Sequence, residues 1–373
     1  MLIIRKGTVH DGKGKVMEAD VLVKDGKISA VGPGLAADGA KEYDATGKVV
    51  MPGFVDALNI WGCMSPVDKD LLEHSDPVTP ELSAVFAFDH ENMVRQGVYQ
   101  FGVTCAGITP SVMNVVGGQA AVFKTHGSHV NQMLVKEGAA MIASVSAAPK
   151  KVYGPRNTAP MTKMGAFALL LQALAKAAGP KKKEAGYDAK SEALKKVLER
   201  EMPLFVNCNT GSEMAAVELA LKDYDIDIVF TGAYGADEQV KRSVVVGDLT
   251  QDISGNNNKV DFESLKKLAD KGVDIAISCC GDVGASGRES LLWNAILWYK
   301  QGFSSGDVLK MITSVPARLL GVDDRVGSIE KGKDADIVIW SANPLEDYRA
   351  VAEASFINGC NVLDTGGKEN AAD

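Results

Sequence analysis

Several side chains that could hold a small ligand are expected at the ends of strands. Apolar runs at 54–60, 204–209, 226–231 and 273–278 carry amide or hydroxyl residues near their ends, and a carboxylate follows the last run. Such groups can hydrogen-bond a ligand without a metal ion. The alternative is that they satisfy backbone groups of nearby loops. The pocket candidates are Asn59, Asn207, Asn209, Thr231 and Ser278, and Asp282 is the only catalytic candidate.

A second group of reactive residues lies at 124–129. Lys124 and His126 would share one face of a strand, because side chains alternate along a strand. They could form a relocated site around an imidazole that titrates near neutral pH. An ordinary polar loop is the alternative. Just upstream, Gly117-Gly118-Gln119 could contact a ligand, although paired glycines more often mark a turn.

The cysteines offer a third possibility, a thiolate site for zinc or copper(I). Five of the six fall near the ends of expected strands, but Cys208 would point away from Asn207 and Asn209, so the five cannot all face one point. The alternative is packing as small apolar residues. The scattered spacing, without a CxxC pair, is typical of reduced thiols. The five are Cys63, Cys105, Cys208, Cys279 and Cys280; the sixth is Cys360.

The elements that must position these residues change character along the chain. Residues 1–50 are predicted to form short strands joined by Asp-Gly turns, which are typical of β-hairpins. From residue 54, apolar runs alternate with helical stretches, which favours βα units and a parallel sheet. The pattern of turn residues followed by short strands appears again at 327–362. Expected strands are 54–60, 98–105, 119–123, 139–145, 204–209, 226–231, 243–247 and 273–278; expected helices are 164–178, 213–221, 262–271, 288–300 and 305–312.

These patterns predict an α/β fold in which a (β/α)8 TIM-like barrel is inserted in a small composite β-sandwich domain. The barrel is expected over residues 54–321, and the sandwich over 1–53 plus 322–373, with the two chain ends pairing. The length fits this division, because a barrel of this kind needs roughly 250 residues.

Composition narrows the classes of function. The chain has 373 residues, 46% of them hydrophobic, and a net charge of −8. No basic excess exists to neutralise a phosphate backbone, so we expect no nucleic-acid partner, and Lys181-Lys182-Lys183 reads as a solvated surface segment. No apolar run reaches membrane-spanning length. The first residues turn polar too soon for a secretory signal, so we expect a cytoplasmic protein.

Three blocks of the sequence carry a family resemblance. They are 50–57 (Val-Met-Pro-Gly-Phe-Val-Asp-Ala), 102–104 (Gly-Val-Thr), and 313–321 continuing through 334–340. With them, the chain resembles the amidohydrolase superfamily, in particular its imidazolonepropionase-like and dihydroorotase-like branch. The resemblance implies hydrolysis of a C–N bond in an amide or cyclic amide by a metal-activated water, with one or two divalent metals such as zinc. It also implies a homo-oligomer.

The positions that match the family's metal ligands hold other residues. Leu58 and Ile60 stand where the resemblance implies a His-x-His pair, and aliphatic side chains have no lone pair to offer a cation. We therefore expect no metal and no cofactor, and we add Leu58, Ile60 and Cys280 to the pocket candidates. The remaining substituted positions are Asn207-Cys208-Asn209 on the fifth strand, Thr231-Gly232 on the sixth, Cys279-Cys280 with Asp282 on the eighth, and Met141 as the match to a bridging lysine.

Three hypotheses about function remain. The first is an amidohydrolase-superfamily protein, nominally of the C–N hydrolase class, whose degenerate site lacks metal-dependent hydrolysis. The second is a non-catalytic homologue that binds a small ligand or acts as a scaffold. The third is a hydrolase with a rebuilt Cys/Asn/Asp site. The expected partner is a small molecule, with no nucleic acid and no membrane.

Overall fold

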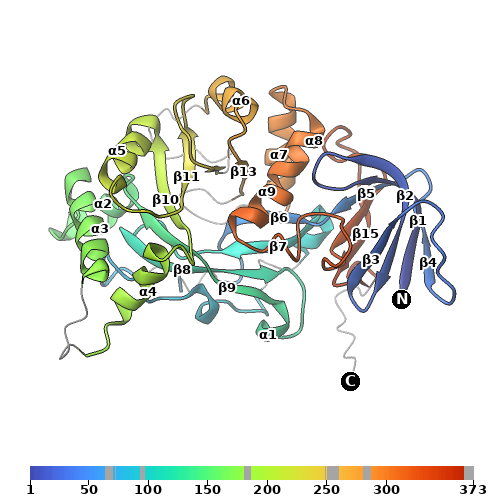
Figure 1. Cartoon of the computed structure of the whole chain (residues 1–373), viewed down its shortest axis with the longest axis horizontal. Helices are drawn as coiled ribbons and strands as arrows, with labels where there is room; N and C mark the ends of the chain where they lie inside the picture. Colours follow the sequence, from blue (N-terminus) through green and yellow to red (C-terminus); the bar gives the residue numbers. More distant parts are fainter. Residues whose placement is uncertain are drawn as a thin grey trace.

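The computed structural model describes residues 1–63, 70–71, 73–92, 97–179, 186–247, 249, 260–279 and 287–364. Within them the strands form two sheets. Figure 1 shows one sheet on the right, which combines β1–β5 with β14–β16, and the other in the body of the molecule. We call them the end sheet and the barrel sheet.

The end sheet joins strands from both ends of the chain. Its hydrogen-bonded order is β16-β15-β14-β5-β1-β2-β3, with β4 also on β1. The joint is the antiparallel pair β5–β14, in which Val50 lies opposite Ile339. The expected pairing of the two ends is therefore confirmed. The strands are β1 (Leu2–His10), β2 (Val16–Lys24), β3 (Lys27–Gly32), β4 (Lys41–Asp44), β5 (Val49–Pro52), β14 (Ile337–Trp340), β15 (Ala352–Ile357) and β16 (Cys360–Asn361).

The end sheet branches at β1. The first half of β1 pairs with β4 and its second half pairs with β5, and Lys6 has a φ of 54° at the change of partner. The turn between β2 and β3 uses Asp25 and Gly26 at φ of 50° and 74°, as the Asp-Gly signal predicts. Apolar residues from β1, β5 and β14, such as Ile4, Val50 and Ile339, share one core.

The barrel sheet has the order β13-β12-β11-β10-β9-β8-β7-β6 and forms a nearly closed barrel. The expected TIM-like barrel is confirmed, with one difference: β8 runs antiparallel to both β7 and β9. The strands are β6 (Phe54–Asn59), β7 (Val103–Ile108), β8 (Val116–Lys124), β9 (Leu134–Ser144), β10 (Leu204–Thr210), β11 (Ile228–Gly235), β12 (Val244–Val246) and β13 (Ile275–Ile277).

The strand expected at 98–105 is partly wrong. Val98–Phe101 forms the 3-10 helix η2, and β7 begins only at Val103. The reason lies in the flanking glycines, because Gly97 and Gly102 both have left-handed φ, at 83° and 86°. Positive φ values interrupt an extended run and allow a tight helical turn.

Most helices of the barrel lie on its outer side (Figure 1). Residues such as Leu204, Val206 and Phe230 pack with them in the larger core cluster. Residues on the opposite strand face, such as Phe205 and Val229, form an inner cluster. The helices are α1 (Val130–Met133), α2 (Ala148–Tyr153), α3 (Lys163–Ala178), α4 (Ala189–Leu198), α5 (Gly211–Leu221), α6 (Phe262–Asp270), α7 (Ser290–Lys300), α8 (Ser305–Met311) and α9 (Ser314–Leu319), with 3-10 turns η1 (Ala84–Phe86) and η3 (Gly154–Arg156).

The segment 73–83, which we call the edge segment, runs beside the first half of β8. Isolated parallel bridges join Val78 to Val116 and Ser83 to Gln119. It therefore lies beside the part of β8 that β7 does not reach, because the β7–β8 ladder ends at Ile108 opposite Ala121.

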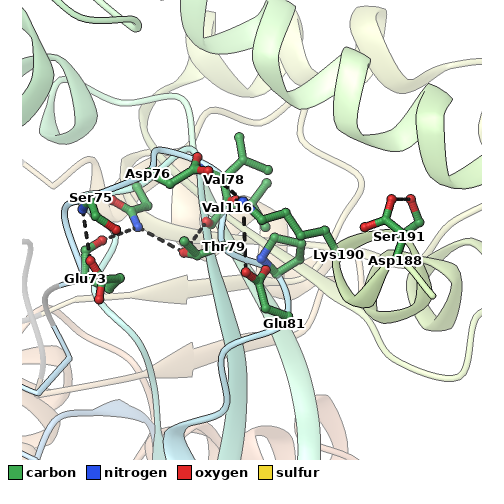
Figure 2. Close-up of polar contacts among 12 residues, drawn as sticks. Glu73, Ser75, Asp76, Val78, Thr79, Glu81, Val116, Asp188, Lys190 and Ser191 are labelled. Atoms are coloured by element: carbon green, nitrogen blue, oxygen red, sulfur yellow. Dashed lines mark hydrogen bonds and ion pairs between the residues drawn. The ribbon is translucent and has the colours of Figure 1, made fainter. Parts of the chain in front are cut away.

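A lysine of α4 fixes this edge segment (Figure 2). The Lys190 ammonium lies 2.6 Å from Asp76 Oδ2 and donates to the Val78 carbonyl at 2.7 Å. Glu81 Oε1 lies at 4.0 Å from the same nitrogen. Thr79 N–H donates to the Val116 carbonyl at 2.9 Å, so the segment is held from both α4 and β8.

The paired glycines of β8 have a packing role. Gly117 and Gly118 lie inside the strand, so they mark no turn. A Cβ at Gly118 would stand 2.6 Å from the Leu82 carbonyl oxygen of the edge segment, and the φ of Gly118 is +126°. Only glycine allows both this backbone conformation and this close approach.

We expect Gly118→Ala to destabilise the fold by about 2 kcal/mol or more, because it adds both backbone strain and a clash with a carbonyl oxygen. Urea denaturation measures the change. Gly154→Ala is the matched control, because a Cβ there meets nothing within 4 Å. Equal stability of the two variants would contradict the packing role of Gly118.

The boundaries expected for the two domains, 1–53 with 322–373 and 54–321, stay predictions. No helix in the described part of the chain combines the length and apolarity needed to cross a bilayer.

Candidate functional site

The seam between β6 and β13 is where the barrel closes. Among the described residues no strand ladder joins these two strands. Side chains make the connection instead. Ser278 Oγ donates to the Leu58 carbonyl at 2.6 Å, and Cys279 Sγ donates to Asp56 Oδ2 at 2.6 Å. The predicted candidates Leu58 and Ser278 thus meet at the seam.

Asp56 is the centre of the seam. Its carboxylate has no exposed surface. Oδ2 accepts from Cys279 Sγ and from Asn59 Nδ2 at 2.6 Å, while Oδ1 accepts from the Cys279 and Leu58 N–H groups at 3.3 and 3.4 Å. Burial raises the pKa of the Asp56 carboxyl, and these donors oppose that rise. The block 50–57, which contains Asp56, carries part of the family resemblance. Nothing in that block identifies Asp56 as a residue that connects β6 to β13.

Asn59 is fully engaged within the protein. Its Nδ2 lies 2.6 Å from Asp56 Oδ2 and 3.0 Å from Cys279 Sγ. Its Oδ1 accepts from the N–H groups of Ile60 and Trp61 at 2.7 and 2.8 Å. Both ends of the amide are therefore used by the fold, which favours the backbone-satisfying role over contact with a ligand.

The two aliphatic residues of β6 and its end lie in the apolar cores. Leu58 is 9% exposed and belongs to the inner cluster, whereas Ile60 is 7% exposed and belongs to the outer one. These two side chains, which the sequence resemblance matches to a His-x-His pair, therefore serve packing.

The ends of β10 and β11 present a second group of candidates. Asn207 alternates with Phe205, and Thr231 with Val229, and both apolar residues lie in the inner cluster. Asn207 and Thr231 are paired in the parallel ladder, so their side chains share the inner face. Ser278 alternates with the inner-cluster residue Ala276 in the same way.

The side chains of Asn209 and Asn207 both approach Gly232 of β11. A Cβ at Gly232 would stand 2.4 Å from Asn209 Oδ1 and 3.0 Å from Asn207 Nδ2. The start of α5 fixes this strand end. Thr210 caps the helix by accepting from the Glu213 N–H, and Glu213 Oε2 accepts from the Asn209 N–H at 2.8 Å. This Thr-x-x-Glu arrangement resembles a capping box, a signal that the sequence contains and that our sequence analysis missed.

Cys280 and Asp282 lie outside the described residues, as does Lys181-Lys182-Lys183. Apart from Ile60, which lies in the outer cluster, the remaining candidates form two groups. The seam group has Asn59, Leu58 and Ser278, and the β10–β11 group has Asn207, Asn209 and Thr231.

Lys124 and His126 face different neighbours. Lys124 is 1% exposed, and its ammonium forms ion pairs with Asp336 and Asp334 of the segment leading into β14. The His126 ring packs edge-on against Tyr99, with 5.6 Å between ring centroids. The ammonium of Lys124 is thus used in a contact between the two sheets.

The buried thiols of the described residues are divided between the two cores. Cys105 lies in the inner cluster, whereas Cys63, Cys208 and Cys279 lie in the outer one. The position of Cys208 agrees with its expected direction. Burial raises the pKa of Cys105 to about 12 and also raises the pKa of Cys63 and Cys208. Protonated, separated thiols favour apolar packing over a shared metal site.

A groove of about 730 Å³ lies at the opposite edge of the barrel sheet, before β12 and β13 begin. It is lined by Glu238, Lys241 and Asp274 among others, and the Lys271 ammonium there already donates to the Glu238 carbonyl. Ligand sites of barrels lie at the other, C-terminal edge. We therefore keep the C-terminal ends of β6, β10, β11 and β13 as the candidate site.

Known proteins resemble this chain both in sequence and in structure. A family model described as Amidohydrolase family matches residues 236–362. The crystal structure of an amidohydrolase from Thermotoga maritima MSB8 superposes with a TM-score of 0.89, at 30% identity over 97% of this chain and 99% of that chain.

Curated relatives match over shorter parts of their length. Amidohydrolase tasK of Hapsidospora irregularis is 25% identical over 380 residues, which cover 87% of this chain and 38% of tasK. A dihydroorotase of Lactobacillus acidophilus is 50% identical over 54 residues, which cover 14% of this chain and 12% of that protein. The chain thus spans less than half the length of either relative.

The raised pKa of Asp56 predicts a pH dependence of stability. A carboxyl whose pKa is raised on folding contributes its full stability below its ordinary pKa of about 4, and loses it as pH rises through the folded value. We expect the unfolding free energy of the native protein, minus that of Asp56→Asn, to fall by about 1 kcal/mol or more between pH 4 and pH 7.

Urea denaturation of both proteins across this pH range measures the difference. Asparagine does not titrate, so any change with pH belongs to the carboxyl. A difference that instead grows with pH would mean that the four donors hold Asp56 ionised.

Proposed function

The chain belongs to the amidohydrolase family, and we propose that it is a member in which metal-dependent C–N hydrolysis has been lost. The main support is the chemistry of the residues at the family's metal positions. Leu58 and Ile60 are aliphatic and packed in the two cores. In place of a third ligand the fifth strand carries Asn207, Cys208 and Asn209, and the thiol of Cys208 faces the outer core.

The polar groups nearest to those positions also fit a divalent cation poorly. Asn59 Oδ1 already accepts two backbone N–H groups. The Asp56 carboxylate is surrounded by four donors, which leaves its lone pairs committed to the seam. Among the described residues no group of three or more His, Cys, Asp or Glu side chains converges as a metal site would need.

Such a barrel retains uncharged polar side chains at the C-terminal ends of its strands. Asn207 and Thr231 are buried, at 3% and 2% exposure, on the inner strand face, and Asn209 is beside them. Amides and hydroxyls can orient a small ligand by hydrogen bonds alone. A non-catalytic role in binding a small neutral molecule is the form of the proposal that these residues support. A homo-oligomer and a cytoplasmic location stay predictions.

The first test concerns metal and turnover. Protein purified without chelator and then supplied with zinc or manganese should retain less than one ion per chain, and cyclic amides and ureides should show no metal-stimulated turnover. Elemental analysis and product detection measure the two outcomes, with a chelator-treated sample as the control. One tightly held zinc or nickel per chain, or turnover that rises with added metal, overturns the proposal.

One observation favours a second candidate function, a hydrolase with a rebuilt thiol site. Cys279 Sγ lies 2.6 Å from Asp56 Oδ2, within reach for the carboxylate to take the thiol proton. The thiolate could then attack an amide carbonyl, form an S–C bond and release the amine with the proton from Asp56. Water would afterwards hydrolyse the thioester. However, Cys279 is only 1% exposed.

Native alkylation separates the two candidates. If the seam is structural, iodoacetamide should modify the exposed Cys360 and leave Cys279 unmodified until denaturant is added. Peptide mass spectrometry reads both sites in one sample, with Cys360→Ser to assign the exposed site. Alkylation of Cys279 in the folded protein, blocked by a cyclic amide that Cys279→Ser no longer turns over, would establish the thiol site instead.

A further inference from the structure

The most deeply buried cation that we find in the described residues is Lys124, at the end of β8. The side chain is 1% exposed, and its Nζ lies 2.5 Å from Asp336 Oδ2 and 3.1 Å from Asp334 Oδ2. A buried ammonium is tolerated only when carboxylates replace its lost water. Burial alone would lower the pKa of Lys124, but the two carboxylates raise it above its ordinary value, so the side chain is charged.

The two aspartates belong to the other sheet and are themselves fixed. Asp334 also accepts from Arg325 at 2.8 Å and from Lys27 of β3 at 3.2 Å. Asp336 Oδ1 accepts from the Asn358 N–H at 3.0 Å, next to β15. The Asp336 carbonyl accepts from the Gly53 N–H, at the junction of β5 and β6. Both carboxylates are therefore held in place where the barrel meets the end sheet.

The reversed direction of β8 explains how Lys124 reaches them. Phe54 and Val103, at the start of β6 and β7, lie at the barrel edge beside the end sheet. Because β8 is antiparallel to β7, Lys124 at its end pairs with Cys105 near the start of β7. A parallel strand would have carried its last residue to the opposite edge, so the reversal brings the ammonium to Asp334 and Asp336.

We propose that Lys124, Asp334 and Asp336 form a latch that couples the end sheet to the barrel, so that the two open together as one cooperative unit. The latch is not the only contact between the sheets. Phe54 of β6 stacks on Trp340 of β14 with centroids 5.8 Å apart and an angle of 18°. This apolar contact lets a variant without the latch still fold, while the coupling between the sheets is weakened.

The test is amide hydrogen exchange in Lys124→Met, which keeps the length and loses the charge. We expect amides of β14 and β15 to exchange at least ~10-fold faster, with a smaller change in β10 and β11, because the end sheet can now open alone. Lys27→Met is the matched control, because this lysine pairs with the same Asp334 but is 56% exposed. It should leave exchange unchanged.

In Lys124→Met, the two buried carboxylates lose their cation and could destabilise the end sheet by themselves. The triple variant Lys124→Met with Asp334→Asn and Asp336→Asn removes these charges as well. If the latch couples the two sheets, the amides of β14 and β15 should still exchange fast in the triple variant. The proposal is overturned by native-like protection in either variant, or by an equal loss of protection in β10 and β11.

Discussion

Closure of the barrel depends on one buried carboxylate, that of Asp56. The strands β6 and β13 are not joined by a ladder among the described residues, so the connection runs through Asp56, Cys279 and the Ser278 hydroxyl. A buried carboxylate is stable only when donors surround it. Asn59 and two backbone N–H groups are recruited for that purpose, so side chains that look available in the sequence are used by the fold.

A second constraint is the reversed strand β8. It leaves an edge beside its first half, which the edge segment 73–83 fills, and it requires Gly118 so that this segment can approach. At its other end it delivers Lys124 to the end sheet. The position and direction of β8 thus explain three features that the sequence shows only as a long loop, a glycine pair and a lysine.

Membership of the amidohydrolase family and the proposed loss of its chemistry rest on different features of this protein. The scaffold is shared along almost its whole length with the amidohydrolase from Thermotoga maritima, at a TM-score of 0.89. A fold carries no reaction by itself, because function lives in the side chains placed on it. Leu58 and Ile60, which our proposal assigns to the family's metal positions, contribute apolar surface to the two cores.

The sequence by itself determined the barrel, the pairing of the two chain ends and most helices, because alternation, turn glycines and helical periodicity are local signals. Alternation also placed Cys208 away from Asn207 and Asn209 correctly. It could not determine the direction of β8, since a run of apolar residues reads the same in a parallel or an antiparallel strand.

Only the tertiary structure decided which polar residues the fold uses. Asp56 and Asn59 share one distant partner, Cys279, which lies 220 positions or more away, and Asp336 lies 212 positions away from Lys124. Such contacts follow from how the sheet closes and where the end sheet docks. No local pattern around either partner records them.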